Sequence, residues 1–375
     1  MENVRIAVVT ESFLPRVDGV ANSVCRVLEH LAARGCEAIV VAPAPGPASY
    51  AGFPVHLVRG VALPFYRSFV VGVPSRRVTT ILEGFRPDVV HLASPSLLGA
   101  SGAMAARRLG VPAVAVLQTD VAGFARQYGL RGTDTLIWSW LCRIHRRAVR
   151  TLVPSTAMLR ELEQRGFPRL ALWGRGVDLE RFHPRHRCER LRSQLAPGGE
   201  IIVGYVGRLA AEKRVHLLAE LADLPGIRLV IVGDGPAERR LRQRLPAAVY
   251  CGFRTGNDLS RILASFDVFA HTGANETFCQ AVQEALASGV PVVAPAAGGP
   301  LDLVRPGYNG LLYPPDDPAS MRTAVATLAG DPFARGRMSD HARRSVSGRT
   351  WASICDELLG HYHDVVAADA GTWAA

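Results

Sequence analysis

Short apolar runs alternate with longer stretches of helical periodicity along most of the chain. In the first half the runs are rich in Val, Ile and Leu, and segments such as residues 20–34 and 97–109 show the spacing of a helix between them. Uninterrupted apolar runs separated by helices predict parallel strands that are buried on both faces. The predicted strands of this half are residues 6–10, 38–42, 55–59, 89–92, 113–117, 151–153 and 170–173.

The same alternation restarts after a polar stretch at residues 183–200, with predicted strands at residues 201–206, 228–232, 268–270 and 291–294. Two sets of alternating strands and helices predict an α/β protein with two Rossmann-like parallel-sheet domains, joined near residues 185–200. In open sheets of this kind ligands bind beyond the carboxyl ends of the strands. The loops that follow the strands are therefore the candidate sites.

Residues 271–289, HTGANETFCQAVQEALASG, contain two carboxylates, Glu276 and Glu284, which are separated by seven residues. An Asn-Glu-Thr sequence before an apolar-periodic run predicts the N-terminus of a helix. The backbone N–H groups of residues 278–280 would then be free to bind an anion or a hydroxyl. Two interpretations follow: a cradle for a sugar phosphate, or an ordinary amphipathic helix with solvated glutamates.

Two cations follow the first predicted strand of the second half. The sequence GYVGRLAAEK places Gly207 and Arg208 at the end of the strand and Lys213 five residues later. This layout suits a diphosphate, because a guanidinium binds two oxygens as a fork and an ammonium is a compact charge. Lys213 is the only lysine among the 43 Lys and Arg residues, which favours a specific role for it. The alternative is a chance position on the surface.

Glycines occur in two further segments of this half, one of which follows a predicted strand. Gly233 opens a Gly-Asp-Gly-Pro turn, and Gly252 with Phe253 offers a flat surface that suits a base. The turn at Gly233 lacks the third glycine of a dinucleotide-binding fingerprint.

The first half has two candidate loops of its own. Gly19 precedes a predicted helix, where the absence of a side chain would let a phosphate approach the backbone, although an ordinary turn has the same sequence. The run Gln118-Thr119-Asp120 places a carboxylate at the end of another predicted strand.

The net charge of +10 is concentrated in one part of the chain. Residues 131–192 carry 14 basic and 6 acidic side chains, whereas residues 193–375 carry 17 and 19. The local excess fits an anionic lipid surface, a nucleic acid, a diphosphate or a solvated face, and no nucleic-acid-binding motif accompanies it, so nucleic acid is not expected. Residues 134–150 predict a helix with a basic end, which either lies on a membrane surface or covers the sheet.

Composition favours a cytoplasmic globular protein. Hydrophobic residues make up 48% of the chain and charged residues 20%, which leaves enough apolar material for two cores. The seven cysteines form no C-x-x-C pair and are odd in number, which favours free thiols in a reducing compartment and argues against a zinc site. We find no signal-peptide core and no apolar run near the roughly 18 residues of a membrane span.

Taken in order, the motifs resemble those of the family-four retaining glycosyltransferases, which have the two-domain GT-B fold. The matching features are Gly207-Arg208 with Lys213, the turn at Gly233, the Glu276 and Glu284 pair, and Gly298-Gly299. Residues 7–23, 87–94, 118–124 and 175–182 look most like segments of actinobacterial GDP-mannose-dependent α-mannosyltransferases.

The resemblance implies two Rossmann-like domains facing each other across a cleft. Residues 1–185 would form the acceptor-side domain, to which a tail helix within residues 351–375 crosses back. Residues 186–350 would form the domain that binds the nucleotide sugar.

The resemblance also implies roles for individual residues. Arg208 and Lys213 would hold the donor β-phosphate, Glu276 would contact sugar hydroxyls, and Glu284 would bind the ribose. The remaining donor-binding residues would be Gly19 at the diphosphate, Gly207 and Gly233 in the loops, Phe278, Cys279 and Gln280 through their amides, and Gly252 and Phe253 at the base.

The chain departs from the family pattern at two positions. Asp18-Gly19 stands where many relatives have two adjacent glycines, and Gln118 stands where many have a histidine near the donor sugar. We therefore take Asp120, beside Gln118, as the candidate catalytic residue on the acceptor side. No Asp-x-Asp occurs, so we expect no metal at the diphosphate and no cofactor besides the nucleotide-sugar co-substrate.

The leading hypothesis is a retaining hexosyltransferase that moves mannose from GDP-mannose to an acceptor hydroxyl. The acceptor would be a glycolipid at the anionic inner face of a membrane, which the charge of residues 131–192 favours, or a small soluble molecule. A UDP-sugar donor with a natural-product acceptor is the alternative. Two other classes are an NAD(P)-dependent oxidoreductase, which the missing glycine fingerprint disfavours, and a non-catalytic basic adaptor, which the paired glutamates disfavour.

Overall fold

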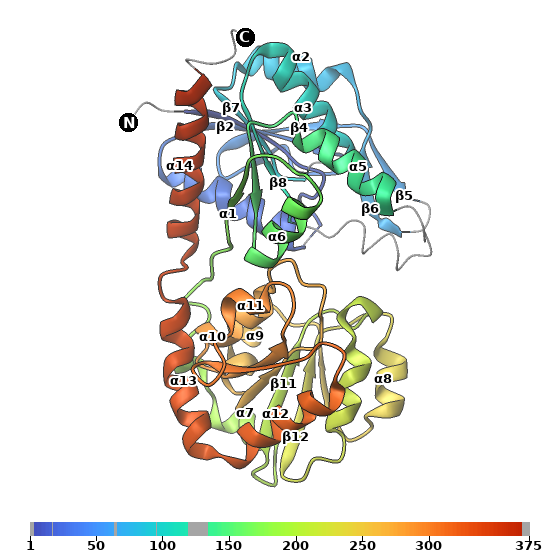
Figure 1. Ribbon diagram of the computed structural model, residues 1–375, viewed down its shortest axis with the longest axis vertical. Coiled ribbons are helices and arrows are strands. Elements are labelled where there is room, and N and C mark those ends of the chain that lie inside the picture. The colour runs from blue at the N-terminus through green and yellow to red at the C-terminus, as the bar shows by residue number, and fades with distance from the viewer. Residues whose placement is uncertain (1–3, 17, 64–65, 95, 119–133, 370–375) are drawn as a thin grey trace. The chain divides into compact units, whose positions relative to one another are not determined.

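A computed structural model describes residues 4–16, 18–63, 66–94, 96–118 and 134–369. The chain forms two compact units, Met1–Arg175 together with Trp351–Ala375, and Gly176–Thr350. Each unit is built around a parallel sheet with helices on both faces, which is the α/β class that the alternating pattern predicts (Figure 1).

The sheet of the first unit has the strand order β10-β9-β8-β7-β1-β2-β4-β3. Its strands are β1 (Arg5–Val9), β2 (Glu37–Pro43), β3 (Ser49–Tyr50), β4 (Phe53–Val58), β7 (Val89–Leu92), β8 (Ala113–Val116), β9 (Arg150–Val153) and β10 (Leu170–Leu172). Neighbours are parallel except for β3 and β4. An antiparallel hairpin of β5 (Gly60–Leu63) and β6 (Tyr66–Gly72) was not predicted, because it lacks the strand–helix alternation by which the other strands were found.

Helices cover both faces of this sheet. They are α1 (Gly19–Ala33), α2 (Arg76–Phe85), α3 (Leu97–Leu109), α5 (Asp134–His145), α6 (Thr156–Gln164) and α14 (Trp351–Asp369). Leu28 of α1 and Leu358 of α14 share one apolar core with Val8 of β1. Leu82 of α2 shares the core on the other face with Val9, the next residue of β1. Successive residues of β1 are therefore buried on opposite faces, which explains its uninterrupted apolar sequence.

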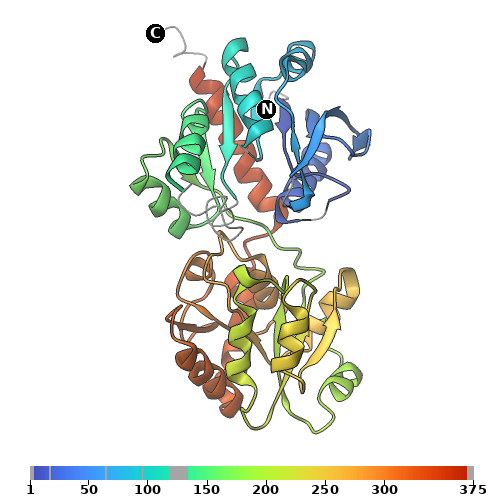
Figure 2. The ribbon, with the colours of Figure 1, turned by 90° about the vertical axis from the view of Figure 1, so that its right-hand side faces the viewer.

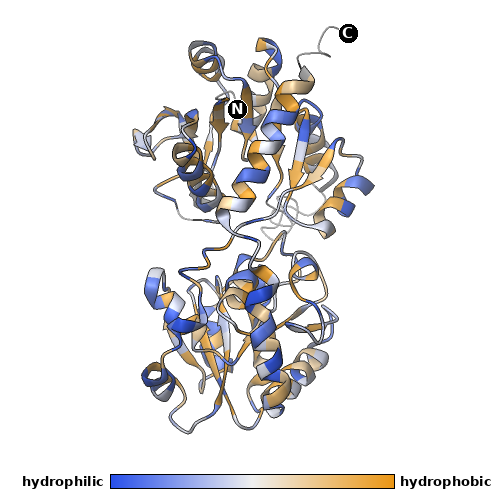
Figure 3. Cartoon of the chain, turned by 90° about the vertical axis from the view of Figure 1, so that its left-hand side faces the viewer, coloured by the Kyte–Doolittle hydropathy of each residue, from blue (hydrophilic) through white to orange (hydrophobic). Residues whose placement is uncertain are grey.

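Helix α14 belongs to the first unit although it follows the second in sequence, as the resemblance implied. In Figure 2 it lies in red among blue and green elements, and in Figure 3 it shows both hydrophilic and hydrophobic residues along its length. The indole N–H of Trp173 donates to the carbonyl of Ile354 at 2.8 Å, and the Tyr362 hydroxyl lies 2.8 Å from Nδ1 of the buried His91. These bonds join α14 to the segments after β10 and within β7.

The sheet of the second unit has the order β13-β12-β11-β14-β15-β16, and its neighbouring strands are all parallel. The strands are β11 (Ile201–Val206), β12 (Ile227–Val232), β13 (Val249–Gly252), β14 (Val268–Ala270), β15 (Val292–Pro295) and β16 (Gly310–Tyr313). The sequence analysis did not assign β13 or β16, which are short and contain glycine at an end. The helices are η1 (Pro184–His186), α7 (Glu189–Leu195), η2 (Ala211–Lys213), η3 (Val215–Leu221), α8 (Glu238–Arg244), α9 (Gly256–Ala264), α10 (Gln280–Ala287), α11 (Pro300–Leu303), α12 (Pro318–Gly330) and α13 (Pro332–Val346).

The first unit ends at Arg175, before the boundary that the sequence placed at residue 185. Val177 forms a bridge with Thr350, and the Arg343 guanidinium donates to the carbonyl of Phe182 at 2.9 Å. Val177 and Phe182 are both buried in the core of the second unit. These contacts explain why residues 176–185 fold with the second unit.

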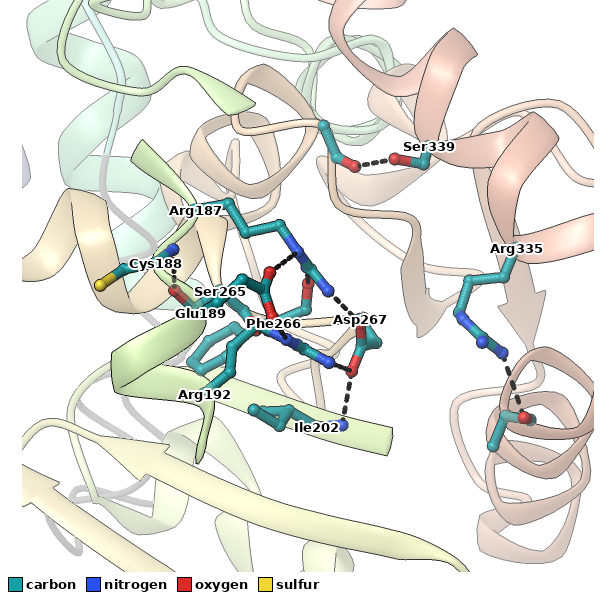
Figure 4. A network of polar contacts seen from close by, with 12 residues as sticks. Arg187, Cys188, Glu189, Arg192, Ile202, Ser265, Phe266, Asp267, Arg335 and Ser339 are labelled. Carbon is teal, nitrogen blue, oxygen red and sulfur yellow. Dashed lines mark hydrogen bonds and ion pairs between the residues drawn. The ribbon is translucent and has the colours of Figure 1, made fainter. Parts of the chain in front are cut away.

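The amino edge of the second sheet is held by a buried carboxylate. Asp267, directly before β14, accepts hydrogen bonds from the Ile202 amide at 2.8 Å and from Arg187 at 2.9 Å, and forms an ion pair with Arg192 at 3.0 Å (Figure 4). The network joins α7 and the segment before it to β11 and β14. The opposite, carboxyl edge carries the residues that the sequence singled out.

Candidate active site

The second sheet reverses its strand order between β11 and β14. From β11 the chain continues outward through β12 and β13, and it then returns to β14 on the other side of β11 and continues through β15 and β16. In open parallel sheets the crevice at such a switch point is where ligands bind. The residues that follow β11 and β14, Gly207-Arg208 and His271, therefore lie at the expected position.

Close backbone contacts hold the loops at this edge. Gly233 has a φ of +130°, and a Cβ atom at this position would lie 2.0 Å from the carbonyl oxygen of Gly207. The amide of Gly233 donates to the carbonyl of Gly252 at 2.9 Å. The structure thus brings together three glycines that the sequence analysis assigned to the donor, and it gives Gly233 a packing reason for lacking a side chain.

The loop that carries Glu276 is held in the same way. The amide of Gly299 donates to the carbonyl of Glu276 at 2.8 Å, and a Cβ atom on Gly299 would lie 2.0 Å from the carbonyl oxygen of Phe278. Only glycine fits there without a shift of the backbone. The Gly298-Gly299 motif therefore packs against the backbone of the loop that carries Glu276.

Lys213 and Glu276 form an ion pair at the switch point. The Lys213 Nζ lies 2.6 Å from Oε1 of Glu276, whose side chain is 12% exposed. The hydroxyl of the buried Thr272 donates to the carbonyl of Lys213 at 2.6 Å and so fixes the η2 turn against the loop after β14. Burial would raise the pKa of Glu276, but Lys213 and His271 outweigh it and hold that pKa well below its usual range. Burial would lower the pKa of Lys213, but Glu276 outweighs it and raises that pKa, so both side chains are charged at neutral pH.

His271 is the residue of this cluster to which the sequence analysis gave no role. Its Nε2 lies 3.2 Å from Oε1 of Glu276 and 3.4 Å from Sγ of Cys279, and its ring stacks on Phe269. Burial would lower the pKa of His271, but Cys279 and Glu276 outweigh it and raise that pKa to about 10. Its position directly after a buried strand was the available indication in the sequence.

Helix α10 begins at Gln280, later than the Asn-Glu-Thr sequence predicted. The residue before it, Cys279, adopts a left-handed conformation with a φ of 75°, and the Phe278 and Cys279 side chains are buried. No described residue accepts a hydrogen bond from the amides of Phe278 or Cys279. Their N–H groups remain candidates for a ligand, but they belong to a loop and not to the first turn of a helix.

The other predicted donor residues occupy the same edge or the elements beside it. Arg208 pairs with Glu212 at 3.3 Å, and Glu212 also helps to raise the pKa of Lys213. Glu284 is half-buried on α10, and burial raises its pKa to about 8, against the opposing effects of Arg181 and Gln280. Phe253, directly after β13, is 62% exposed and offers an aromatic face to solvent.

In the first unit, Gly19 is the first residue of α1, which Asp18 caps by accepting hydrogen bonds from the next two amides at 2.9 Å. A Cβ atom on Gly19 would lie 2.7 Å from a guanidinium nitrogen of the buried Arg175. Arg175 in turn donates to Oε1 of Gln118 at 2.8 Å. Asp120, the acceptor-side candidate, lies outside the described residues.

Comparison with known proteins decides the family. The model of Glycosyltransferase Family 4 matches residues 17–181, and that of Glycosyl transferases group 1 matches residues 188–345. A GDP-mannose-dependent alpha-mannosyltransferase of Mycobacterium tuberculosis (strain CDC 1551 / Oshkosh) is 52% identical over 372 residues, which cover 97% of this chain and 98% of that protein. The chain belongs to glycosyltransferase family 4.

More distant relatives agree with this family 4 assignment. The sulfoquinovosyl transferase SQD2 of Arabidopsis thaliana is 33% identical and covers 94% of this chain and 72% of that protein. Among solved structures, sucrose-phosphate synthase from Thermosynechococcus elongatus has a TM-score of 0.79 at 21% identity, covering 97% of this chain and all of that one. Anabaena Alr3699/HepE in complex with UDP has a TM-score of 0.78 at 21% identity, covering 96% and 100%. The protein is therefore a glycosyltransferase with the GT-B fold, and the oxidoreductase and adaptor alternatives are set aside.

The groups at this edge of the second sheet combine positive charge with hydrogen-bond donors and acceptors. Arg208 and Lys213 supply positive charge, and the amides of Phe278 and Cys279 supply hydrogen-bond donors. Glu276 supplies acceptors, which are the partners that sugar hydroxyls need. Cations and N–H donors that are held in fixed positions stabilise the negative charge that develops on a leaving group.

Proposed function

We propose that this enzyme transfers a mannosyl group from GDP-mannose to an acceptor hydroxyl, with retention of anomeric configuration and without a metal ion. The Lys213–Glu276 pair at the switch point supports the proposal, because a cation lies beside a carboxylate whose oxygens are acceptors for hydroxyl groups. The choice of donor is supported by the names of the actinobacterial relatives, which are 46–52% identical.

Each polar group at the edge has a role in this reaction. When the bond between the sugar and the phosphate breaks, negative charge grows on the diphosphate. Arg208 grips two of its oxygens, and Lys213 approaches one as a compact charge. Glu276 holds sugar hydroxyls with the help of the amides before α10, and Glu284 accepts hydrogen bonds from the ribose. Gly252 and Phe253 lie against the base.

The acceptor is proposed to be a glycolipid at an anionic membrane surface. Among the described residues no helix is long and apolar enough to cross a membrane. Helix α5 buries Trp138 and Leu141 in the first unit, and leaves Leu136 72% and Trp140 42% exposed. Leu136, Trp140 and the exposed Arg143 recur at helical spacing, so one stripe combines apolar anchors with a cation. This combination is typical of helices that lie in a membrane interface.

A panel of nucleotide sugars tests the donor. GDP-mannose at 1000-fold excess over its dissociation constant should stabilise the protein by about 4 kcal/mol and raise its melting temperature. GDP-mannose should also be turned over with a lipid extract or a small-molecule acceptor, with an α-linked mannosyl product. Stabilisation and turnover with UDP-glucose or UDP-N-acetylglucosamine, and neither with GDP-mannose, would contradict the proposed donor.

A further inference from the structure

Three side chains of metal-ligating type converge at the switch point. Nε2 of His271, Oε1 of Glu276 and Sγ of Cys279 all lie within 4.8 Å of one another. His271 comes from the end of β14, and the other two come from the loop before α10. All three side chains are largely buried, so the loop and strand hold them in place with little freedom to swing away.

Two of the three separations between these atoms are close to the edges of a zinc coordination tetrahedron. Zinc lies about 2.0–2.2 Å from His nitrogen and carboxylate oxygen and about 2.3 Å from Cys sulfur, so tetrahedral ligands are about 3.3 Å apart for N···O and about 3.6 Å for N···S. The observed N···O and N···S separations are 3.2 Å and 3.4 Å. Because Nε2 lies near both other atoms, one ion in front of that nitrogen would reach all three ligands once Oε1 and Sγ, which lie within 4.8 Å of each other, adjust to its coordination sphere.

Lys213 already holds the oxygen that such an ion would use. Its Nζ lies 2.6 Å from Oε1 of Glu276, so an ion must displace the ammonium group. A thiolate and an imidazole favour zinc, cadmium and other soft ions over Mg²⁺, which prefers oxygen ligands. The ligand set therefore selects a thiophilic ion that can compete with Lys213.

We propose that His271, Glu276 and Cys279 bind a thiophilic divalent cation such as Zn²⁺, and that this ion inhibits transfer by withdrawing Glu276 from the donor and from Lys213. Binding releases the thiol proton of Cys279, and any proton on Nε2 of His271, to solvent. The ion takes no part in the transfer reaction. The binding of the ion is inferred from the geometry alone, whereas the inhibition by the ion rests on the proposed role of Glu276.

Cadmium tests the site without measuring activity. Reduced protein without a histidine tag, titrated with Cd²⁺, should bind one ion and develop an ultraviolet thiolate-to-cadmium absorption band. Cys279→Gly is the matched variant, because glycine readily adopts the φ of 75° found there. It should lose the band and bind Cd²⁺ at least about 10–100-fold more weakly, the range for loss of even an outer partner of a metal ligand.

Cys251→Ser, which changes a half-buried thiol elsewhere in the second unit, is the control and should bind Cd²⁺ as the natural protein does. Circular dichroism checks that both variants fold. A band of equal strength and affinity in Cys279→Gly would overturn the site, as would a wild-type protein that shows no such band.

A kinetic measurement then tests the inhibition. Zn²⁺ should raise the apparent KM for the donor, Mg²⁺ should not, and a chelator should restore the rate. Each variant is compared with itself in the presence and absence of Zn²⁺, so that its basal rate does not enter. Cadmium binding at His271, Glu276 and Cys279 without any loss of donor affinity would keep the metal site and contradict the donor role of Glu276.

Discussion

At the scale of single residues, two positively charged side chains contact the same carboxylate oxygen of the candidate site. Oε1 of Glu276 lies 2.6 Å from Lys213 and 3.2 Å from His271. A carboxylate that is held by two cations keeps its charge over a wide pH range. Geometry at this oxygen should therefore matter more to the rate than net charge does.

Lys213→Arg tests that expectation while conserving charge. A planar guanidinium cannot place a compact charge at the position of Nζ, so kcat should fall by roughly 10²-fold, the scale of losing one transition-state donor. Lys213→Ala should be at least as damaging, and donor KM should change less than kcat in both variants if the contact tightens in the transition state. Steady-state kinetics with GDP-mannose measures this. Arg239→Lys, an exposed substitution on α8, is the control, and wild-type kcat in Lys213→Arg would show that Lys213 is an ordinary surface residue.

Glu284 gives a pH-dependent prediction. Burial raises its pKa to about 8 from an ordinary 4.5, so between these values the folded protein holds a proton that the unfolded chain has released. Stability that is present below pH 4.5 is therefore lost as pH rises towards 8, with a slope of at most about 1.4 kcal/mol per pH unit from this group. Ribose hydroxyls that donate to the carboxylate would favour its charged form. Donor binding near pH 7 should thus release a proton.

Calorimetry of donor binding in two buffers of different ionisation enthalpy measures that proton. The observed heat should depend on the buffer for the natural protein and become independent of it in Glu284→Gln. Equal buffer dependence in both proteins would assign the proton to another group and remove Glu284 from the ribose site.

Some residues could be identified from the sequence and others could not. Lys213 was chosen as a candidate because it is the only lysine of the chain. Glu276 was chosen because it belongs to a recognisable motif after a predicted strand. Their ion pair was not predictable, because it joins positions 213 and 276 only after β11 and β14 become neighbours. The contacts of His271 and the pair of Arg175 with Gln118 were missed for the same reason.

At the scale of elements, long apolar runs predicted strands well and local polar motifs predicted helix starts less well. The start of α10 was placed too early because the backbone turns through a left-handed residue, Cys279, that no local motif announces. Strands β13 and β16 were not assigned because each has a glycine at one end, which shortens its apolar run. Both are defined by pairing with a neighbour and not by their own sequence.

Helix α5 provides the prediction at this scale. Leu136→Gln with Trp140→Gln removes the two exposed apolar side chains and should lower affinity for anionic vesicles by at least about 10-fold, given about 0.8 kcal/mol for each buried CH₂ group. Arg143→Gln should weaken binding by a further ~1 kcal/mol and reduce its salt dependence. Vesicle co-sedimentation at low salt measures both. Met104→Gln, which changes an exposed apolar residue of α3, is the matched control, and vesicle binding that is absent in the natural protein would favour a soluble acceptor.

At the scale of the whole molecule, each unit has its own apolar cores. The hydroxyl of Tyr362 in α14 is bonded to His91 in the first unit, and burial lowers the pKa of His91 to about 4, so this histidine is neutral at pH 7. Tyr362→Phe leaves Nδ1 of the buried His91 without this hydrogen-bond partner. The loss should lower the free energy of unfolding by about 1–3 kcal/mol.

Hydrogen exchange, measured separately for peptides of each unit, should show which elements lose stability in this variant. Tyr362→Phe should speed exchange in α14 and β7, whereas GDP-mannose should slow exchange in the loops after β11 and β14. Tyr308→Phe, whose ring stacks on His341 in the second unit, is the control. Faster exchange confined to residues 176–350 in Tyr362→Phe would contradict the assignment of α14 to the first unit.

The path of the chain also sets the order in which the two units are completed during translation. The chain leaves the first unit after Arg175 and returns to it at Trp351, so the ribosome makes every residue of the second unit before it begins α14. At about 5–20 residues per second, roughly 16–65 s pass between the synthesis of Leu28 in α1 and the start of α14, the helix that covers it. The nascent chain therefore exposes an incomplete core of the first unit while the second unit is being made, and in that interval the first unit is most prone to aggregation.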